Sequence, residues 1–430
     1  MHYSILFTRI IITIAFFEAR PWSPTYQVIL LPGEARPSDF LIISVMAVIE
    51  EVSSSSHSHG PSPSHSSLSA ARVLSSGSFV TTTVLEDAVA ASPAPLVGPP
   101  PAELPSGRGG HAACTAPLPA DAREGEDVCC VVFGGANREP TVFDDVWRLV
   151  GNSSTGAFRW KRVVAPPLTN DDGVQHAPSA RSGASASLVG KHVYVFGGQD
   201  PASGMVFNDV HALDTETGGW QRIEPASQSP PPMHSHACGV LRGRCLLVFG
   251  GASPNGVHAD VYVFDTETRT WTNAKVSADD GVRVPAPREM HSGIMADDCT
   301  MVVYGGRGAD GAVLDDAAVL DASDGAKFMW RRRRRTGHAR CAHASAAAFG
   351  GSAALVHGGF TGSAVAANPE LLDVASLSLR TAAPAHERAD IPRFAHAAAA
   401  ADLSSSSAVV LFGGVTPEED LADVLLWTAS

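Results

Sequence analysis

An apolar run that ends in a pair of glycines occurs six times along this chain. The runs are "CCVVFGG" (129–135), "VYVFGG" (193–198), "LLVFGG" (246–251), "MVVYGG" (301–306), "ALVHGG" (354–359) and "VVLFGG" (409–414). Runs that are continuously apolar, rather than alternating, predict strands that are buried on both faces. Repeats of about 50 residues predict propeller blades, because one such sheet cannot bury both of its faces alone.

Five residue types recur in the same order around these runs. The glycine pairs are Gly134, Gly135, Gly197, Gly198, Gly250, Gly251, Gly305, Gly306, Gly358, Gly359, Gly413 and Gly414. A histidine precedes five of the pairs (His111, His236, His291, His343, His396), and an arginine lies three residues before four of these histidines (Arg108, Arg288, Arg340, Arg393). The aspartates that follow the pairs are Asp145, Asp209, Asp260, Asp316, Asp373 and Asp423, and the closing tryptophans are Trp160, Trp220, Trp271 and Trp330. We interpret this set as architecture: glycines for sharp turns, and polar side chains that satisfy the turn backbone.

This pattern resembles the kelch-repeat family of β-propellers, which also includes the galactose oxidase type. The resemblance covers residues 106–430 and implies an all-β fold with six blades, at about 106–165, 178–225, 231–275, 285–331, 337–382 and 391–430. Three departures are visible: Ala184 replaces the histidine of blade two, Met233 the arginine of blade three, and His357 the aromatic residue of blade five.

The last blade lacks a fourth strand, because few residues follow Asp423. An open sheet edge is a liability. The β-rich segment "SFVTTTVLED" (78–87) precedes the repeats, and we predict that residues 79–85 complete blade six. The propeller domain would then span 78–430.

Two segments precede that domain. Residues 1–45 are rich in isoleucine and phenylalanine, and we consider two explanations: a mis-assigned start, with Met46 as the true one, or a weak signal sequence. Residues 46–77 form a Ser/His/Pro-rich, low-complexity stretch that we predict to be a disordered linker.

Catalytic motifs are weak. Gly306–Gly311 fits G-x-G-x-x-G, but a strand is expected after it rather than a helix that could receive a phosphate. The histidines could converge as metal ligands, yet one per blade at a regular offset favours a structural role. The iron-binding run of nitrile-specifier relatives has no counterpart here. We therefore expect no catalytic residue, metal or cofactor.

The net charge of −13 disfavours broad binding to nucleic acid or membranes. Against this background stands the run Arg331–Arg335, which we assign to the loop between blades four and five. It could contact an acidic or phosphorylated patch of a protein partner, or act as a nuclear import signal. A cytoplasmic location is otherwise expected, and secretion is disfavoured.

The resemblance implies a non-catalytic protein-interaction scaffold or adaptor that uses the loops joining second to third strands and neighbouring blades. The alternative is an enzyme, or a protein that binds a small sugar-type ligand in the central pocket. The predicted partner-binding residues are Arg138, Asp200, Asn255, Arg307, Asp310, Arg331, Arg332, Arg333, Arg334 and Arg335.

Overall fold

The computed structural model describes residues 2–7, 10–15, 77–81, 83–84, 104–164, 176–325, 327–382, 391–400 and 408–429. The chain forms two units, Met1–Glu50 and Glu51–Ser430. In the first, β1 (His2–Phe7) pairs antiparallel with β2 (Ile10–Ala15). The predicted linker 46–77 lies outside the described residues except for Gly77, and the two explanations for residues 1–45 remain hypotheses.

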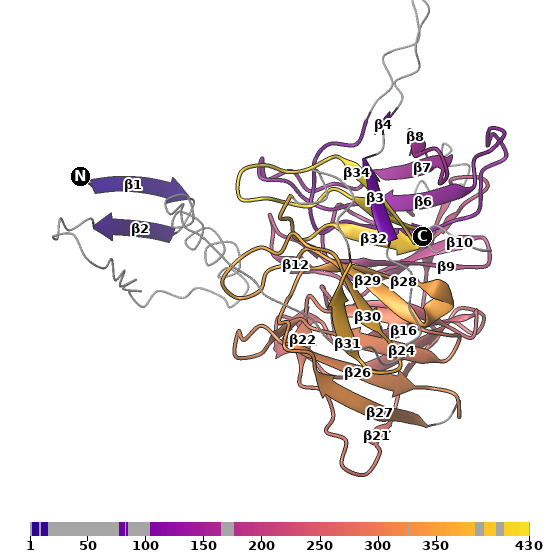
Figure 1. The fold of residues 1–430 in the computed structure, drawn as a ribbon, viewed down its shortest axis with the longest axis vertical. Coiled ribbons are helices and arrows are strands. Elements are labelled where there is room, and N and C mark those ends of the chain that lie inside the picture. The colour runs from indigo at the N-terminus through magenta and orange to yellow at the C-terminus, as the bar shows by residue number, and fades with distance from the viewer. Residues whose placement is uncertain are drawn as a thin grey trace, which may run out of the picture. The chain divides into compact units, whose positions relative to one another are not determined.

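The second unit is an all-β propeller of six blades, as predicted (Figure 1). Blade one has β5 (Ala112–Thr115), β6 (Val128–Phe133), β7 (Val146–Asn152) and β8 (Ala157–Val163), and blade two has β9 (Ser185–Val189), β10 (His192–Phe196), β13 (Val210–Asp214) and β14 (Trp220–Ile223). Blade three has β15 (Ala237–Leu241), β16 (Cys245–Phe249), β19 (Val261–Asp265) and β20 (Thr270–Asn273), and blade four has β23 (Ser292–Met295), β24 (Thr300–Tyr304), β26 (Asp316–Asp321) and β27 (Phe328–Arg335). Blade five has β28 (Ala344–Ala348), β29 (Ala353–His357), β30 (Glu370–Asp373) and β31 (Ser378–Thr381), and blade six has β32 (Ala397–Ala400), β33 (Ala408–Phe412) and β34 (Val424–Ala429).

Short secondary-structure elements lie in the connections between the main strands of the blades. Two hairpins, β11–β12 (Gln199–Asp200, Met205–Val206) and β17–β18 (Ala252–Ser253, Gly256–Val257), lie in the loops between second and third strands. β22 (Arg288–Glu289) pairs with β25 (Arg307–Gly308), and a 3₁₀ turn spans Phe349–Gly351. Among the described residues, no helix has the length and apolarity needed to cross a membrane.

The innermost strands of the blades form a closed circle. Around it, β5 contacts β9, β9 contacts β15, and the sequence of contacts continues through β23, β28 and β32 back to β5. Along the chain, the blades follow one another from purple through magenta and orange to yellow in Figure 1.

The segment predicted to complete blade six divides between two sheets. β3 (Gly77–Thr81) lies antiparallel beside β34, with Gly77 opposite Ala429 and Thr81 opposite Leu425. β4 (Thr83–Val84) pairs instead in parallel with the start of β8 in blade one. Closure of the ring by residues 79–85 therefore stays a prediction, which truncation can test.

The core lies between the blades. Each closing tryptophan packs on the aromatic ring that precedes the glycine pair of the previous blade, as the Trp271 and Phe196 rings show at 4.7 Å between centroids. The equivalent pairs are Trp160 on Phe412, Trp220 on Phe133 and Trp330 on Phe249. The second strands β6, β29 and β33 are buried along their whole length, as their continuous apolar runs predicted. All seven cysteines have free thiols.

Candidate binding face

A buried arginine holds the entrance of five blades. In blade one, Arg108 donates from Nη1 to the carbonyl oxygen of Gly134 at 3.1 Å and from Nη2 to Asp145 at 3.1 Å. The same triangle joins Arg181 to Gly197 and Asp209, Arg288 to Gly305 and Asp316, Arg340 to Gly358 and Glu370, and Arg393 to Gly413 and Asp423. A buried guanidinium needs such a partner, because desolvation of a lone charge is costly. Each triangle therefore fixes the loop between second and third strands against the segment that enters the blade.

In blade five, the structure differs from the prediction at one residue. The acid that pairs with the buried arginine is Glu370, whereas the sequence pattern assigned this position to Asp373. The acid must stand at the start of the third strand, and β30 begins at Glu370. Asp373 ends that strand and accepts a hydrogen bond from the backbone N–H of Ser376 at 2.7 Å, so it caps a turn instead.

Blade three has neither member of the buried pair. Met233 takes the place of the arginine and is fully buried. The side chain of Asp260 is 44% exposed and lies 3.6 Å from Nδ1 of His258. An apolar side chain can therefore fill the arginine site when the acid is solvated.

The recurring histidines lie one to each interface between blades, rather than converging as a ligand set. His111 packs edge-on against Phe412 of the previous blade at 5.0 Å, and the equivalent pairs are His236 on Phe196, His291 on Phe249, His343 on Tyr304 and His396 on His357. Burial lowers the pKa of His111, His236 and His343 to about 3 and holds the pKa of His291 and His396 well below its usual value. These imidazoles are therefore neutral at pH 7, and they pack between neighbouring blades.

The second glycine of each pair links one blade to the next. Gly135 donates its N–H to the carbonyl oxygen of Arg181 at 2.9 Å, across the boundary between blades one and two. The same bond recurs at every boundary: Gly198 to Met233, Gly251 to Arg288, Gly306 to Arg340, Gly359 to Arg393 and Gly414 to Arg108. The last of these joins blade six to blade one.

A second circle of backbone hydrogen bonds runs around the axis, two residues after each arginine position. Its members are Gly110, Gly183, Ser235, Met290, Ala342 and Ala395, and each donates its N–H to the carbonyl oxygen of its counterpart in the previous blade at 2.7–2.9 Å. All six have φ between 53° and 68°, a left-handed conformation. We call these six residues the mouth, and the surface around it, formed by the loops between second and third strands and between blades, the loop face.

The surroundings of the mouth differ from one side to the other. On the side of blades five and six, Phe360, Phe394 and Val415 are partly exposed and form an apolar sector. Phe360 pairs with Cys341, next to Ala342, and Val415 pairs with Phe394, next to Ala395. On the side of blades two to four the neighbours are polar, giving a polar sector: Ser182, Gln199, His234, Glu289 and Arg307. The face thus offers apolar contact area next to hydrogen-bonding groups, the combination from which recognition surfaces are built.

Arg307 and Glu289 form the charged pair of the polar sector. The guanidinium of Arg307 donates from Nε to Oε1 of Glu289 at 3.0 Å. The side chain of Glu289 is 4% exposed, while that of Arg307 is 20% exposed. Arg307, a predicted binding residue, thus lies beside the mouth with its orientation fixed by a buried carboxylate.

Arg138, another predicted binding residue, ties two loops of the chain together. Its backbone N–H donates to Asp420 at 2.8 Å, and its guanidinium donates to the carbonyl oxygens of Pro417, at 2.8 Å, and Thr416. These bonds connect blade one to blade six, so Arg138 stabilises the junction between the first and last blades.

The remaining predicted loop residues stand at turn tips. Asp200 accepts from Ala202 N–H and Ser203 Oγ, and Asp310 accepts from Ala312 N–H, so both cap their own turns. Asn255 is exposed at the tip of the β17–β18 hairpin. A role in binding remains a prediction for these residues.

The arginine run is not a loop. Arg331–Arg335 form the second half of β27, the outermost of the four repeat strands of blade four, and residues 332–335 pair with β26. The run extends the strand because its side chains find partners on both faces of the blade. Arg331, Arg333 and Arg335 donate to Asp321, Asp316 and Asp315, at 2.7–3.1 Å. Arg332 and Arg334 donate to the backbone carbonyl oxygens of Val374, Ala375 and Ser376 in blade five.

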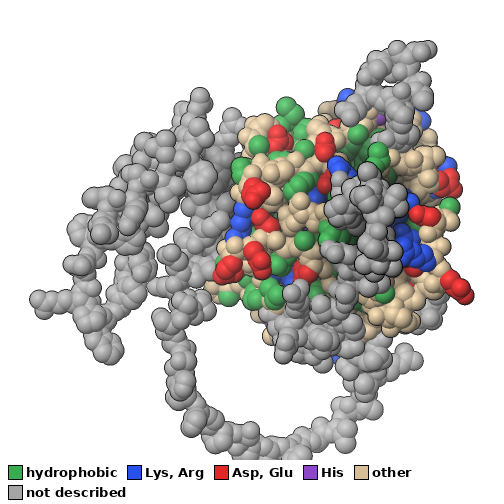
Figure 2. Space-filling view, turned by 90° about the horizontal axis from the view of Figure 1, so that it is seen from above, with side chains coloured by type: hydrophobic (Ala, Val, Ile, Leu, Met, Phe, Trp, Pro, Cys, Tyr) green, Lys and Arg blue, Asp and Glu red, His purple; other side chains and the backbone are tan. Residues whose placement is uncertain are grey.

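Three of the five charges of the run thus have a carboxylate partner within the protein. On the face drawn in Figure 2, the Lys and Arg side chains of the described residues are intermixed with Asp and Glu. This distribution differs from the continuous basic stripe that nucleic-acid grooves use.

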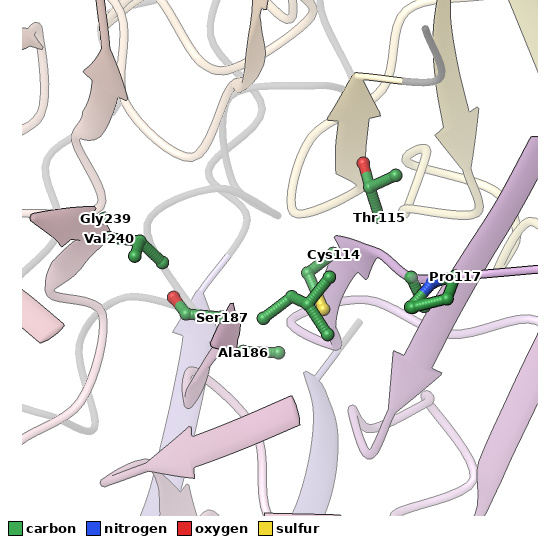
Figure 3. A pocket seen from close by; sticks show the side chains of 9 residues that line it. Cys114, Thr115, Pro117, Ala186, Ser187, Gly239 and Val240 are labelled. Atoms are coloured by element: carbon green, nitrogen blue, oxygen red, sulfur yellow. The ribbon is translucent and has the colours of Figure 1, made fainter. Parts of the chain in front are cut away.

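A cavity of about 430 Å³ opens among the inner strands of blades one to three, at the ends that point away from the mouth. Its lining is small and mostly apolar, as Figure 3 shows, and consists of Cys114, Thr115, Ala116, Pro117, Ala186, Ser187, Leu188, Gly239 and Val240. Its two hydroxyl groups already have partners, since Thr115 donates to the carbonyl oxygen of Ala400 and Ser187 donates to the sulfur of Cys238. A sugar needs several polar partners, so this lining fits an apolar ligand better.

Two features of the face were missed in the sequence. Arg181 has the same buried pair as its counterparts, and its spacing three residues before Ala184 was the available signal. The pair Arg307–Glu289 joins two loops of blade four, and no local sequence pattern predicted it.

Comparison with known proteins agrees with this architecture. Residues 97–283 match the KLHDC2/KLHL20/DRC7 Kelch-repeats domain. The F-box/kelch-repeat protein At1g51550 of Arabidopsis thaliana is 27% identical over 212 residues, which are 46% of this chain and 41% of that protein. The solved structure of YjhT has the same fold, with a TM-score of 0.55 at 16% identity, over 75% of this chain and 95% of its own. The protein carries a kelch-repeat propeller.

The curated relatives are longer than their matched parts. Acyl-CoA-binding domain-containing protein 4 of Arabidopsis thaliana is 36% identical over 146 residues, which are 34% of this chain and 21% of that relative. The chain thus spans only part of the length of these relatives, and the activities named for them belong to them.

Proposed function

We propose that the protein is a non-catalytic interaction scaffold whose loop face docks a segment of a protein partner. The observation that carries the proposal is the apolar sector of Phe360, Phe394 and Val415 beside the oriented guanidinium of Arg307. The buried arginine triangles and the inter-blade hydrogen bonds hold the loops in place. A rigid face loses little conformational entropy on binding, which favours affinity.

A small-ligand function in the central cavity is the second candidate. It would use the apolar lining around Leu188 and Val240 rather than a polar sugar site. Nothing in that lining offers a general acid, a base or a nucleophile with an activated pKa. Burial in fact raises the pKa of the Cys114 thiol to about 12, which leaves it unreactive.

Affinity purification can test the docking face. The full chain carrying the paired changes F360S and V415S should lose the partners that the unmodified chain retains, at an unchanged melting temperature. The control is L118S, because Leu118 is 42% exposed on the opposite side of blade one, in the β5–β6 hairpin. Identical partner sets from the loop-face variant and the unmodified chain would refute the proposal. Loss only in the L118S chain would move the docking site to the opposite face.

A further inference from the structure

The outer edge of blade four is covered over only part of its length. β21 (Val276–Ala278) lies parallel to β27 and pairs with Phe328, Met329 and Trp330. Asp279 then donates its N–H to the carbonyl oxygen of Trp330 at 3.0 Å, after which the chain turns. Within the described residues, no strand pairs with the outer edge of β27 from Arg331 to Arg335. Figure 1 shows β21 and β27 together at the periphery of the propeller.

A β-bulge marks the boundary between the two halves of β27. Trp330 lies opposite Leu320 and Arg332 opposite Val319, so Arg331 is the extra residue. Beyond it, Arg332 and Arg334 point to the side of blade five, while Arg333 contacts Val284 and Asp316 on the other side. The five arginines therefore fall into two sets with different surroundings.

The two sets differ in charge balance. Arg331, Arg333 and Arg335 each have a carboxylate partner, and Arg331 also reaches Asp279 at 3.0 Å. Arg332 and Arg334 have only carbonyl oxygens as partners among the described residues, and both are exposed. Carbonyl oxygens accept hydrogen bonds but do not neutralise a charge. Two uncompensated positive charges therefore stand two residues apart on one face of an open strand, about 6.6 Å along the chain.

The chain itself shows that the outer edges of its blades accept an added strand. β21 adds in parallel to β27, and β4 adds in parallel to β8 of blade one. An open edge supplies backbone donors and acceptors, and flanking side chains select what may bind. Here the flanking charges select for acidic residues.

We propose that the Arg331–Arg335 half of β27 is a strand-addition site for an extended acidic segment of a partner protein. Carboxylates at alternate positions of that segment would lie beside Arg332 and Arg334, because cross-strand neighbours on one face stand about 5 Å apart. Charge-assisted bonds to these guanidiniums supply the selectivity, and the backbone of the strand supplies the pairing. This site lies on the outer wall of blade four, so it is separate from the loop face.

The alternative role of an arginine-rich edge is protection. Charged side chains on an edge strand discourage pairing with other chains. The two roles predict different behaviour toward acidic strands: protection repels every strand alike, whereas a site prefers one spacing of charges.

Fluorescence anisotropy with the full chain can distinguish a strand-addition site from edge protection. The probe is a labelled peptide of about eight residues in which Glu and Val alternate, compared with a peptide of the same composition in which the Glu residues are contiguous at one end. We expect the alternating peptide to bind at least about tenfold more tightly, and to weaken as salt rises to about 0.5 M. The variant R332Q/R334Q should lose at least about tenfold in affinity for it.

The matched control is R162Q/R222Q, which removes the same charge from the outer strands of blades one and two. It should bind as the unmodified chain does. Hydrogen exchange gives a second readout, because backbone pairing should slow exchange at residues 331–335 when the peptide is present. Equal affinity for both peptides, an equal loss in the control, or unchanged exchange would overturn the proposal. Absence of binding would leave the arginines as edge protection.

Discussion

The backbone N–H of Gly110 donates to the carbonyl oxygen of Ala395 at 2.7 Å, which joins the first blade to the last. The same junction holds the bond from Gly414 to the carbonyl oxygen of Arg108 at 2.9 Å. The junction between the two ends of the repeat therefore carries the same two backbone bonds as every internal boundary. Loss of either bond should weaken the junction, which Arg138 also bridges through its hydrogen bonds to Asp420 and Pro417.

Replacement of Gly414 by alanine should break this junction. Gly414 has φ of 97°, and an added Cβ would lie 2.7 Å from Cβ of His396 and 2.9 Å from the carbonyl oxygen of Phe394. Gly204 provides the control, since it has φ of 74° at a turn with nothing within 4 Å. We expect G204A to cost about 1 kcal/mol of unfolding free energy, from the backbone conformation alone. G414A should cost at least about 2 kcal/mol more, because of the close contacts. Urea unfolding measures both, and equal costs would contradict the close packing at this boundary.

Removal of residues 1–99 should weaken the propeller, if the segment beside β34 closes blade six. A chain that lacks only residues 1–60 retains β3 and serves as the control. The longer deletion exposes the edge of β34, so it should lower the melting temperature and raise aggregation. Identical melting of the two truncated chains would refute the closing role of residues 79–85.

Substitution within a buried arginine triangle should depend on which member is removed. D423N leaves the fully buried guanidinium of Arg393 without its counter-charge, which should cost about 3–5 kcal/mol. The double variant R393M/D423N should cost less, because Met233 shows that methionine fits this site. Chemical denaturation of the two variants checks the order. A double variant less stable than D423N would contradict the interpretation.

Acid should destabilise the propeller below the ordinary pKa of histidine. In the fold the pKa of His236 is about 3 because burial desolvates it, whereas the unfolded chain takes up the proton near pH 6.5. The stabilising contribution is thus complete above pH 6.5 and is lost as the pH falls toward 3. At pH 5 each such histidine costs about 2 kcal/mol.

Stability curves of H236F test this origin. Phenylalanine keeps a ring against Phe196 and cannot be protonated, so the loss of unfolding free energy between pH 7.5 and pH 5 should shrink by about 2 kcal/mol. An unchanged pH dependence would show that other groups set the acid sensitivity.

The sequence predicted the blades because their causes are local and repeated. Continuous apolar runs, glycine pairs and closing tryptophans each depend on short spacing, and the strands fall where these patterns placed them. Six copies also reinforce one another, so a departure such as Met233 stands out against the rest.

The errors occurred where a residue depends on partners in another strand or loop. Five consecutive arginines look like a solvated loop until Asp315, Asp316 and Asp321 come beside them. Glu370 was overlooked because the pattern sought an aspartate, although the geometry requires only a carboxylate at the start of the third strand. The apolar sector around Phe360 and Phe394 arises from two blades that meet, and neither residue is distinctive in its own repeat.

The six hydrogen bonds of the mouth all point in the same rotational direction around the axis. Their bond dipoles therefore run head to tail in a circle, and their components in the plane of the ring cancel. Its six N–H groups are already committed to neighbouring carbonyl oxygens. The ring thus offers none of these N–H groups to an incoming chain, and changes of specificity can come through single side chains such as Arg307 without rebuilding the ring.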